Sequence, residues 1–224
     1  MPRITDIDAA IFDMDGTLLD TMPYWRFTAL EYALYHQWRL HADLIARMPS
    51  TSSRRLLLEY AEREGVRIDY NDMVRELEGY MNRHYLYDAH LKDPCVPAFL
   101  EQLKARGVRL CVATGSPRAY ARNGLGRLGL LDYFDFVTDN VEFGITKDRP
   151  GYYDAVLARL GAAPERTWVF EDALYAMESA RHSGLRICAI EDEAQRADRE
   201  AIHAIADICI AGYAELLAET GAGR

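Results

Sequence analysis

The stretch AAIFDMDGTLLD, residues 9–20, decides how this chain is built. An apolar run that suits a buried strand ends at Phe12 and is followed directly by Asp13, Asp15 and Gly16. Burying an ionised carboxylate costs free energy unless a cation or another partner compensates its charge. The two aspartates are therefore candidates for holding a metal ion or for attacking a substrate.

Five more short apolar runs follow along the chain, and stretches with helical spacing lie between them. Together with the first run, the expected strands are Ile7–Phe12, Arg109–Ala113, Phe136–Thr138, Thr167–Phe170, Arg186–Ile190 and Asp207–Ile210. Short apolar strands that alternate with helices are typical of a mainly parallel sheet with helices on both faces. The sequence therefore predicts an α/β fold with a Rossmann-like, three-layer core.

Residues 21–88 interrupt this alternation between the first and second expected strands. They contain no β-like run, and segments such as RRLLLEYAEREG (54–65) carry apolar residues at three- and four-residue spacing. We therefore expect an inserted α-helical domain over residues 21–88. Residues 1–20 and 89–224 are expected to form the core domain.

The composition narrows the class of protein. The 224 residues carry a formal net charge of -9 at pH 7, which argues against general binding to nucleic acid or to anionic membranes. No apolar run approaches the ~20 residues of a membrane-spanning helix, and the first residues show no signal-peptide pattern. The four cysteines form no C-x-x-C pair, so neither a zinc site nor a redox motif is indicated, and we expect buried, reduced thiols. We expect a cytoplasmic protein, and the sequence does not indicate its oligomeric state.

Polar side chains follow four of the expected strands, at the points where these strands end. They are Asp13 and Asp15 after the first strand, Thr114, Gly115 and Ser116 after the second, Lys147 in the loop after the third, and Glu171 and Asp172 after the fourth. Any one of them could be a helix cap, a turn residue or a solvated charge. Because ligands of open α/β sheets bind beyond the carboxyl ends of the strands, the shared position indicates a site. Its chemistry suits one hard cation and one anionic substrate.

These groups, in this order, resemble the motifs of the haloacid dehalogenase superfamily. The segment DMDGT (13–17) matches the first motif, D-x-D-G-T, and the later motifs are matched by Thr114, Lys147 and the pair Glu171 and Asp172. The resemblance is to the phosphatase and β-phosphoglucomutase-like branch, which carries a helical C1-type cap after the first strand. Residues 21–88 would be that cap. Two departures are DRP after the lysine in place of P-x-P, and Ala173 where a serine is common; neither removes a charged group.

The resemblance implies a Mg²⁺-dependent phosphatase that acts on a small phosphorylated metabolite, such as a sugar phosphate. Asp13 would be the nucleophile, which becomes an aspartyl phosphate, and Asp15 would be the general acid and base. Mg²⁺ would be held by Asp13, Asp172 and the main-chain carbonyl of Asp15, with Glu171 as a direct or indirect ligand. The phosphoryl oxygens would be bound by Lys147, Thr114 and main-chain N–H groups near Gly115 and Ser116.

The same resemblance leaves a phosphosugar mutase of the β-phosphoglucomutase type open. Those mutases usually keep a histidine in the first cap helix where this chain has Trp25, and they use a cap lysine, whereas residues 21–90 contain no lysine. Both departures favour a hydrolase. A non-catalytic, regulatory member of the family is a further alternative, although such a protein would normally have lost a catalytic acid.

Substrate selection is expected from the helical insertion, because the core residues would contact mainly the phosphate. Trp25 and Tyr24 could form an apolar wall, and Arg47 and Arg54 could reach a second anionic group of the substrate. Aromatic residues at helical spacing usually belong to a core, and arginines in loops are usually solvated. A purely structural role for these four residues is therefore the alternative.

Overall fold

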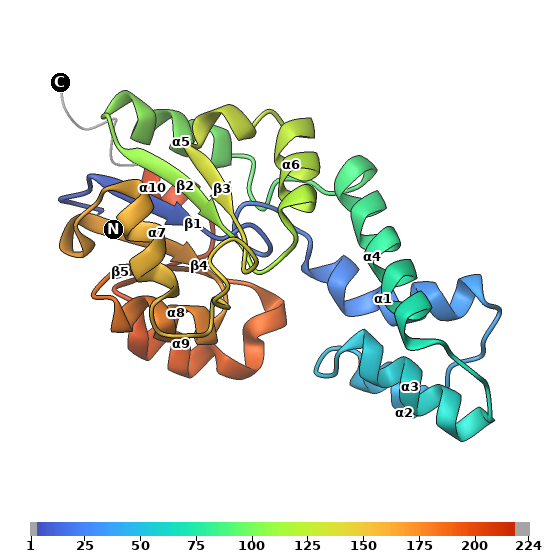
Figure 1. Ribbon diagram of the computed structural model, residues 1–224. Helices are drawn as coiled ribbons and strands as arrows, with labels where there is room; N and C mark the ends of the chain where they lie inside the picture. The colour runs from blue at the N-terminus through green and yellow to red at the C-terminus, as the bar shows by residue number, and fades with distance from the viewer. Residues whose placement is uncertain (1–3, 218–224) are drawn as a thin grey trace. The chain divides into compact units, whose positions relative to one another are not determined.

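The computed structural model of the chain describes residues 4–217. Within them the strands form a six-stranded parallel sheet with the order β3-β2-β1-β4-β5-β6 (Figure 1). The strands are β1 (Ala9–Phe12), β2 (Arg109–Ala113), β3 (Phe136–Thr138), β4 (Thr167–Glu171), β5 (Arg186–Ile190) and β6 (Ile208–Ile210). The prediction of an α/β, Rossmann-like fold with a parallel sheet is confirmed.

The expected strand bounds are wrong by one or two residues at three ends. The first strand begins at Ala9 rather than Ile7, although the Asp8 main chain still bonds to Arg166 O and to the Arg109 N–H; the chain enters through Asp6, whose φ of 51° is left-handed. The sixth begins at Ile208, since the Asp207 carboxylate itself accepts a hydrogen bond from the Ile187 N–H at 2.8 Å. The fourth extends by one residue to Glu171, which keeps its pairing with β5.

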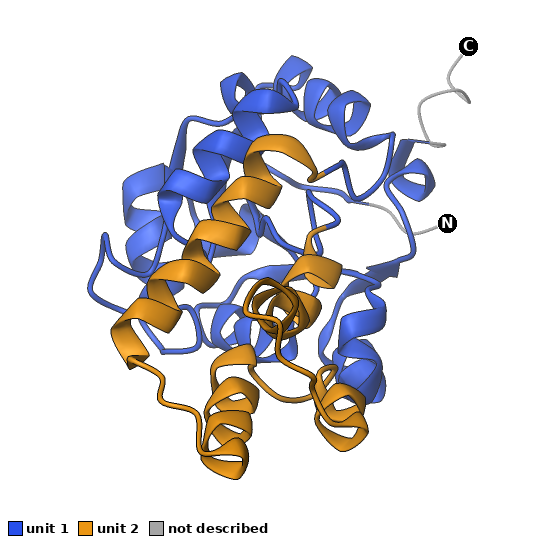
Figure 2. Cartoon of the chain, turned by 90° about the vertical axis from the view of Figure 1, so that its right-hand side faces the viewer, with its two compact units in different colours: residues 1–20, 90–224 blue, residues 21–89 orange. Residues whose placement is uncertain are grey.

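The chain divides into two compact units, 1–20 with 90–224, and 21–89 (Figure 2). The helices of the first unit are α5 (Val96–Ala105), α6 (Arg118–Arg127), α7 (Tyr152–Leu160), α8 (Leu174–His182), α9 (Arg199–Ile205) and α10 (Ala214–Leu217), with short 3-10 segments η1 (Leu131–Tyr133), η2 (Pro164–Arg166) and η3 (Glu193–Asp198). The second unit holds α1 (Met22–Tyr35), α2 (Ala42–Arg47), α3 (Ser53–Glu64) and α4 (Tyr70–Tyr87).

The sheet is buried on both faces, as expected for parallel strands between two helical layers. Side chains of β1 alternate between the faces: Ile11 belongs to the cluster that contains Tyr153 of α7, while Phe12 packs against Phe99 of α5. Phe12 also stacks on Phe170 of β4, with 4.3 Å between ring centroids. Packing on both faces fixes the register of β1 between its neighbours, and with it the side chains that follow the strand.

The unit of residues 21–89 has a hydrophobic core of its own. Side chains of its four helices form one buried cluster, which includes Tyr32, Leu44, Leu57 and Leu77. Helix α4 begins at a capping side chain, because Asp69 accepts a hydrogen bond from the Asp72 N–H at 3.0 Å. This unit is helical throughout its described secondary structure, whereas its role as a cap stays a prediction.

The strand order places a topological switch point beside β1. From β1 the sheet grows outward through β2 and β3 on one side, and the chain then returns to add β4, β5 and β6 on the other side. Open α/β sheets form a ligand crevice at the carboxyl ends of the strands where this reversal occurs. Here those ends belong to β1 and β4.

Candidate active site

The turn after β1 fixes the first two aspartates. The Asp13 N–H donates to the carbonyl of Phe170 at 2.9 Å, so Asp13 continues the pairing with β4 although the strand ends one residue earlier. Gly16 then adopts a φ of 78°, which side chains with a Cβ rarely adopt, and its N–H donates to Leu19 O at 2.8 Å. The tight turn holds Asp13 in the crevice with only 6% of its surface exposed.

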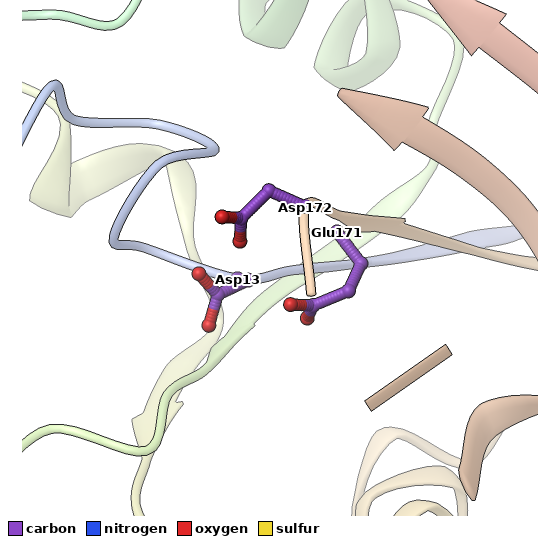
Figure 3. A group of neighbouring side chains, drawn as sticks. All are labelled: Asp13, Glu171 and Asp172. Atoms are coloured by element: carbon purple, nitrogen blue, oxygen red, sulfur yellow. The ribbon is translucent and has the colours of Figure 1, made fainter. Parts of the chain in front are cut away.

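Three buried carboxylates meet at the ends of β1 and β4. Ligand oxygens of Asp13, Glu171 and Asp172 all lie within 4.8 Å of one another. Figure 3 shows Asp13 approaching from β1, with the carboxylates of Glu171 and Asp172 reaching toward it from the end of β4. Three like charges at this separation repel one another strongly when water is excluded.

A single buried ammonium lies against two of these carboxylates. Lys147 Nζ is 2.5 Å from Asp13 Oδ1 and 2.6 Å from Glu171 Oε2, and the lysine side chain is 2% exposed. Burial alone would lower the pKa of Lys147, but the charges of Asp13 and Glu171 outweigh it and raise the pKa well above its usual value. The lysine is therefore a fixed positive charge.

One positive charge does not balance three negative charges. Burial, followed by the charge of Glu171, raises the pKa of Asp13 to about 8, even though Lys147 acts in the opposite direction. Burial and the charges of Glu171 and Asp13 also raise the pKa of Asp172 well above its usual value. When the three carboxylates and the ammonium are all ionised, the cluster needs two more positive charges to be neutral. The atoms that it offers to a metal ion are carboxylate oxygens. A hard divalent cation such as Mg²⁺ fits both requirements.

The second aspartate of the turn lies in a different environment. Asp15 is partly exposed, and its Oδ2 accepts a hydrogen bond from Ser116 Oγ at 2.6 Å. The loop after β2 is thereby joined to the turn after β1. Within this loop Thr114 Oγ1 accepts the Ser116 N–H at 3.0 Å, so this N–H, expected to bind a phosphoryl oxygen, is directed to the threonine here. The Thr114 hydroxyl keeps its own proton for donation.

Two neighbouring side chains were missed by the sequence analysis. Asn140 Oδ1 accepts the Lys147 N–H at 2.9 Å, and its Nδ2 donates to Gly115 O at 3.4 Å, so it ties the lysine loop to the loop after β2. Gln195 Nε2 donates to Asp172 Oδ2 at 3.1 Å. Asn140 lies two residues beyond β3, so the expectation that site residues follow the strands could have found it. Nothing in the sequence points to Gln195.

The two aromatic residues expected to select the substrate have partners within their own unit. Tyr24 stacks on His84 with 4.3 Å between ring centroids, and Trp25 Nε1 donates to the Tyr85 hydroxyl at 3.1 Å. Both are partly exposed. These contacts agree with a structural role, and a role in substrate selection stays a prediction.

The two arginines differ from each other. Arg47 forms a two-pronged ion pair with Glu59, at 2.6 Å and 3.1 Å, so it would have to share its guanidinium to bind a second anionic group. Arg54 is exposed at the start of α3. Of the two, Arg54 is the one whose charge is more open to a ligand.

Comparison with known proteins decides the family. The family model described as haloacid dehalogenase-like hydrolase matches residues 7–184, which include every residue of the buried cluster. The chain belongs to the haloacid dehalogenase-like hydrolases. The match also spans the helical insertion and the loops of Thr114 and Lys147.

The relatives of this hydrolase are named as phosphatases. It is 32% identical over 189 residues to the phosphorylated carbohydrates phosphatase of Thermotoga maritima, covering 80% of this chain and 82% of that protein. It is 29% identical over 175 residues to a fructose-1-phosphate phosphatase of Escherichia coli, covering 78% and 92%. A solved structure from Thermotoga maritima, described as a "putative beta-phosphoglucomutase", has a TM-score of 0.76 at 27% identity, over 91% and 94% of the two chains. These findings confirm the prediction of a phosphoric monoester hydrolase.

Gln195→Ala tests whether its hydrogen bond orients Asp172 for metal binding. We expect the Kd for Mg²⁺, measured by calorimetry, to rise about tenfold, since the partners of metal ligands typically contribute this much to affinity. Arg196→Ala, on the neighbouring and exposed residue of η3, is the matched control and should leave the Kd unchanged. Equal Kd values for the wild type and Gln195→Ala would contradict the expectation.

The pKa of Asp13 predicts how pH and Mg²⁺ act on stability. It is about 8 in the folded protein and 3.8 ordinarily, so between these values the folded chain holds a proton that the unfolded chain has lost. This group's contribution to the free energy of unfolding is therefore full below pH 3.8 and is lost as pH rises through about 8.

Mg²⁺ requires the ionised carboxylates, so it should compensate most where this loss is largest. We expect the rise in Tm from chelator to excess Mg²⁺ to be larger near pH 8 than near pH 6, measured by thermal denaturation. Asp13→Asn should reduce the difference between the two pH values. A rise in Tm that is the same at both pH values in the wild type would refute the link.

Proposed function

We propose that this hydrolase is a Mg²⁺-dependent phosphatase of small phosphorylated carbohydrates that works through an aspartyl phosphate on Asp13. The observation that carries the proposal is the buried cluster of Asp13, Glu171 and Asp172, which is short of two positive charges beside Lys147. An anionic nucleophile can approach an anionic phosphate only where such a site supplies compensating cations.

The two aspartates divide the covalent chemistry. An Asp13 carboxylate oxygen attacks phosphorus, the bond from phosphorus to the ester oxygen breaks, and Asp15 gives its proton to the departing oxygen. Water then attacks the phosphorus of the aspartyl phosphate, Asp15 takes the proton from that water, and Asp13 is released with inorganic phosphate. The hydrogen bond from Ser116 Oγ holds the Asp15 carboxylate beside the loop after β2 for both transfers.

The residues that would hold Mg²⁺ are Asp13, Asp172 and the main-chain carbonyl of Asp15, with Glu171 as a direct or indirect ligand. When bound, the ion reduces the repulsion between nucleophile and phosphate. The Glu171 carboxylate accepts a hydrogen bond from the Ala173 N–H at 3.1 Å and forms an ion pair with Lys147. It therefore also holds the lysine ammonium in place.

The phosphoryl group would be held by Lys147 and by the loop after β2. The ammonium of Lys147 neutralises charge between nucleophile and phosphate, and the Thr114 hydroxyl donates to a phosphoryl oxygen together with main-chain N–H groups near Gly115 and Ser116. Asn140 contacts both Lys147 and Gly115, so it holds the lysine loop and the loop after β2 in a fixed relative position.

The substrate class follows from the relatives and the insertion. Two relatives are named for phosphorylated carbohydrates and fructose 1-phosphate, and we assign this chain the same general class. Trp25 and Tyr24 would contact the carbohydrate, and Arg47 and Arg54 a second anionic group. We infer a cytoplasmic enzyme, a setting in which its four free cysteine thiols stay reduced.

A phosphosugar mutase is the second candidate, because one structural relative is described as a "putative beta-phosphoglucomutase". A mutase returns the phosphoryl group to a second hydroxyl of the sugar, whereas a phosphatase passes it to water. The lack of any lysine in residues 21–90 and the presence of Trp25 favour the phosphatase.

Asp13→Asn tests the nucleophile. We expect turnover of p-nitrophenyl phosphate with Mg²⁺ to fall by about a thousandfold or more, because an amide cannot form the covalent intermediate. Acid quenching of the wild type during turnover should yield a phosphorylated peptide that contains Asp13, detected by mass spectrometry. Asp132→Asn, on an exposed residue of η1, is the matched control. Turnover well above background in a folded Asp13→Asn protein would contradict the role of Asp13 as the nucleophile.

A second assay separates the phosphatase from the mutase. With a panel of sugar phosphates that includes β-glucose 1-phosphate, we expect inorganic phosphate to be released in step with loss of the ester, with and without a sugar bisphosphate. Chelation of Mg²⁺ should abolish the release and added Mg²⁺ should restore it. Conversion of β-glucose 1-phosphate to an isomer with little free phosphate would favour the mutase instead.

A further inference from the structure

Tyr175 lies beside the site although no motif of the sequence includes it. It is the second residue of α8, three residues beyond Asp172, and 51% of its surface is exposed. Its hydroxyl lies 4.0 Å from the point that a Cβ on Gly115 would occupy. The phenol therefore reaches from α8, after β4, to the loop after β2, where the phosphate is expected to bind.

The hydroxyl end of this side chain lies within the field of the buried cluster. Burial first, and then the charges of Glu171, Asp13 and Asp172, raise the pKa of Tyr175, while Lys147 acts to lower it. A phenol whose pKa is raised keeps its proton at neutral pH. It can therefore act as a hydrogen-bond donor toward an anion.

This donor has no acceptor in the protein. Across residues 4–217 the structure gives the Tyr175 hydroxyl no hydrogen-bond partner. Two other tyrosines have acceptors: the Tyr80 hydroxyl donates to Glu76 Oε2 at 3.2 Å, and the Tyr213 hydroxyl donates to Thr17 O at 3.3 Å. Within this part of the chain the Tyr152 and Tyr153 hydroxyls also lack a partner, but both side chains are fully buried in α7 and cannot meet a ligand, whereas Tyr175 is half exposed. A free donor at the edge of an anion site is available to a ligand.

Gly115 leaves the space below this hydroxyl open. A Cβ at that position would lie 3.8 Å from Asn140 Nδ2 and 4.0 Å from the Tyr175 hydroxyl, so it would occupy the gap between these two donors. Asn140 Nδ2 and the Tyr175 hydroxyl thus both lie on the side of Gly115 that carries no side chain, in the loop that also holds Thr114. Hydrogen-bond donors in this position suit an oxyanion.

We propose that Tyr175 is a substrate-binding residue whose hydroxyl donates a hydrogen bond to a phosphoryl oxygen of the bound ester. The inference rests on the proposed function in that its ligand is a phosphate monoester. The contact is made to the phosphoryl group and not to the carbohydrate, because the hydroxyl lies over Gly115 in the phosphate loop. It exists with inorganic phosphate as well as with the ester.

Tyr175→Phe removes only the hydroxyl, and inorganic phosphate is the probe. In the presence of saturating Mg²⁺, we expect the Kd for phosphate measured by calorimetry to rise about tenfold, as for loss of one hydrogen bond to a charged group. KM for the sugar phosphate should rise by the same factor with kcat within about twofold, because the contact is present before and during reaction. The Kd for Mg²⁺ should not change.

Tyr70→Phe is the matched control, since Tyr70 is 49% exposed and belongs to the other unit. A Kd for phosphate that is equal in the wild type and Tyr175→Phe overturns the inference, as does a wild type that does not bind phosphate. A loss of Mg²⁺ affinity in Tyr175→Phe would indicate a structural role and also overturn it. The two proposals can fail separately. If Tyr175→Phe binds phosphate more weakly but the wild type hydrolyses no ester, the role of Tyr175 in phosphate binding is supported and the phosphatase activity is refuted.

Discussion

One buried ammonium shared by several buried carboxylates is the constraint on which the site depends. Lys147 contacts Asp13 and Glu171 at 2.5 Å and 2.6 Å, and among the described residues no basic side chain forms an ion pair with the neighbouring Asp172. Breaking such a pair inside a protein is costly, because the remaining charge has lost its water. The lysine therefore keeps Asp13, the proposed nucleophile, in the crevice, while the uncompensated carboxylate favours binding of a second cation.

The sheet makes this arrangement possible. Asp13 and the pair Glu171 and Asp172 are far apart in the chain but adjacent in space, since β1 pairs with β4 in register, Phe12 against Phe170. The apolar side chains of these strands are buried on both faces, and a slip of one residue would turn each of them to the wrong layer. Packing of the apolar side chains on β1 and β4 thus also fixes the distance between the carboxylates that follow these two strands.

The sequence predicts those parts of the site that follow strands. Asp13, Thr114, Lys147 and the acidic pair are each within a short loop of a strand end, and parallel strands bring such ends to one edge whatever the details of packing. Gln195 could not be found in this way, and Tyr175, four residues beyond the end of β4, lies on helix α8 and not in the loop that follows the strand. Their positions depend on how the segment η3 and helix α8 pack on the sheet, which is set by contacts distant in the sequence.

The two aspartates of the opening turn lie in two different environments, which supports the two chemical roles proposed for them. The Asp13 N–H makes the last main-chain hydrogen bond from β1 to β4, and its buried carboxylate contacts Lys147 instead of water. This carboxylate can therefore be ionised only when cations surround it. Asp15 lies two residues further on, after the chain has begun to turn, and there it is partly exposed and bound by a serine hydroxyl. A nucleophile benefits from a fixed, dry position, whereas an acid that must exchange protons with water needs access to it. The turn at Gly16 provides both environments within four residues, so one short segment can carry both proposed roles.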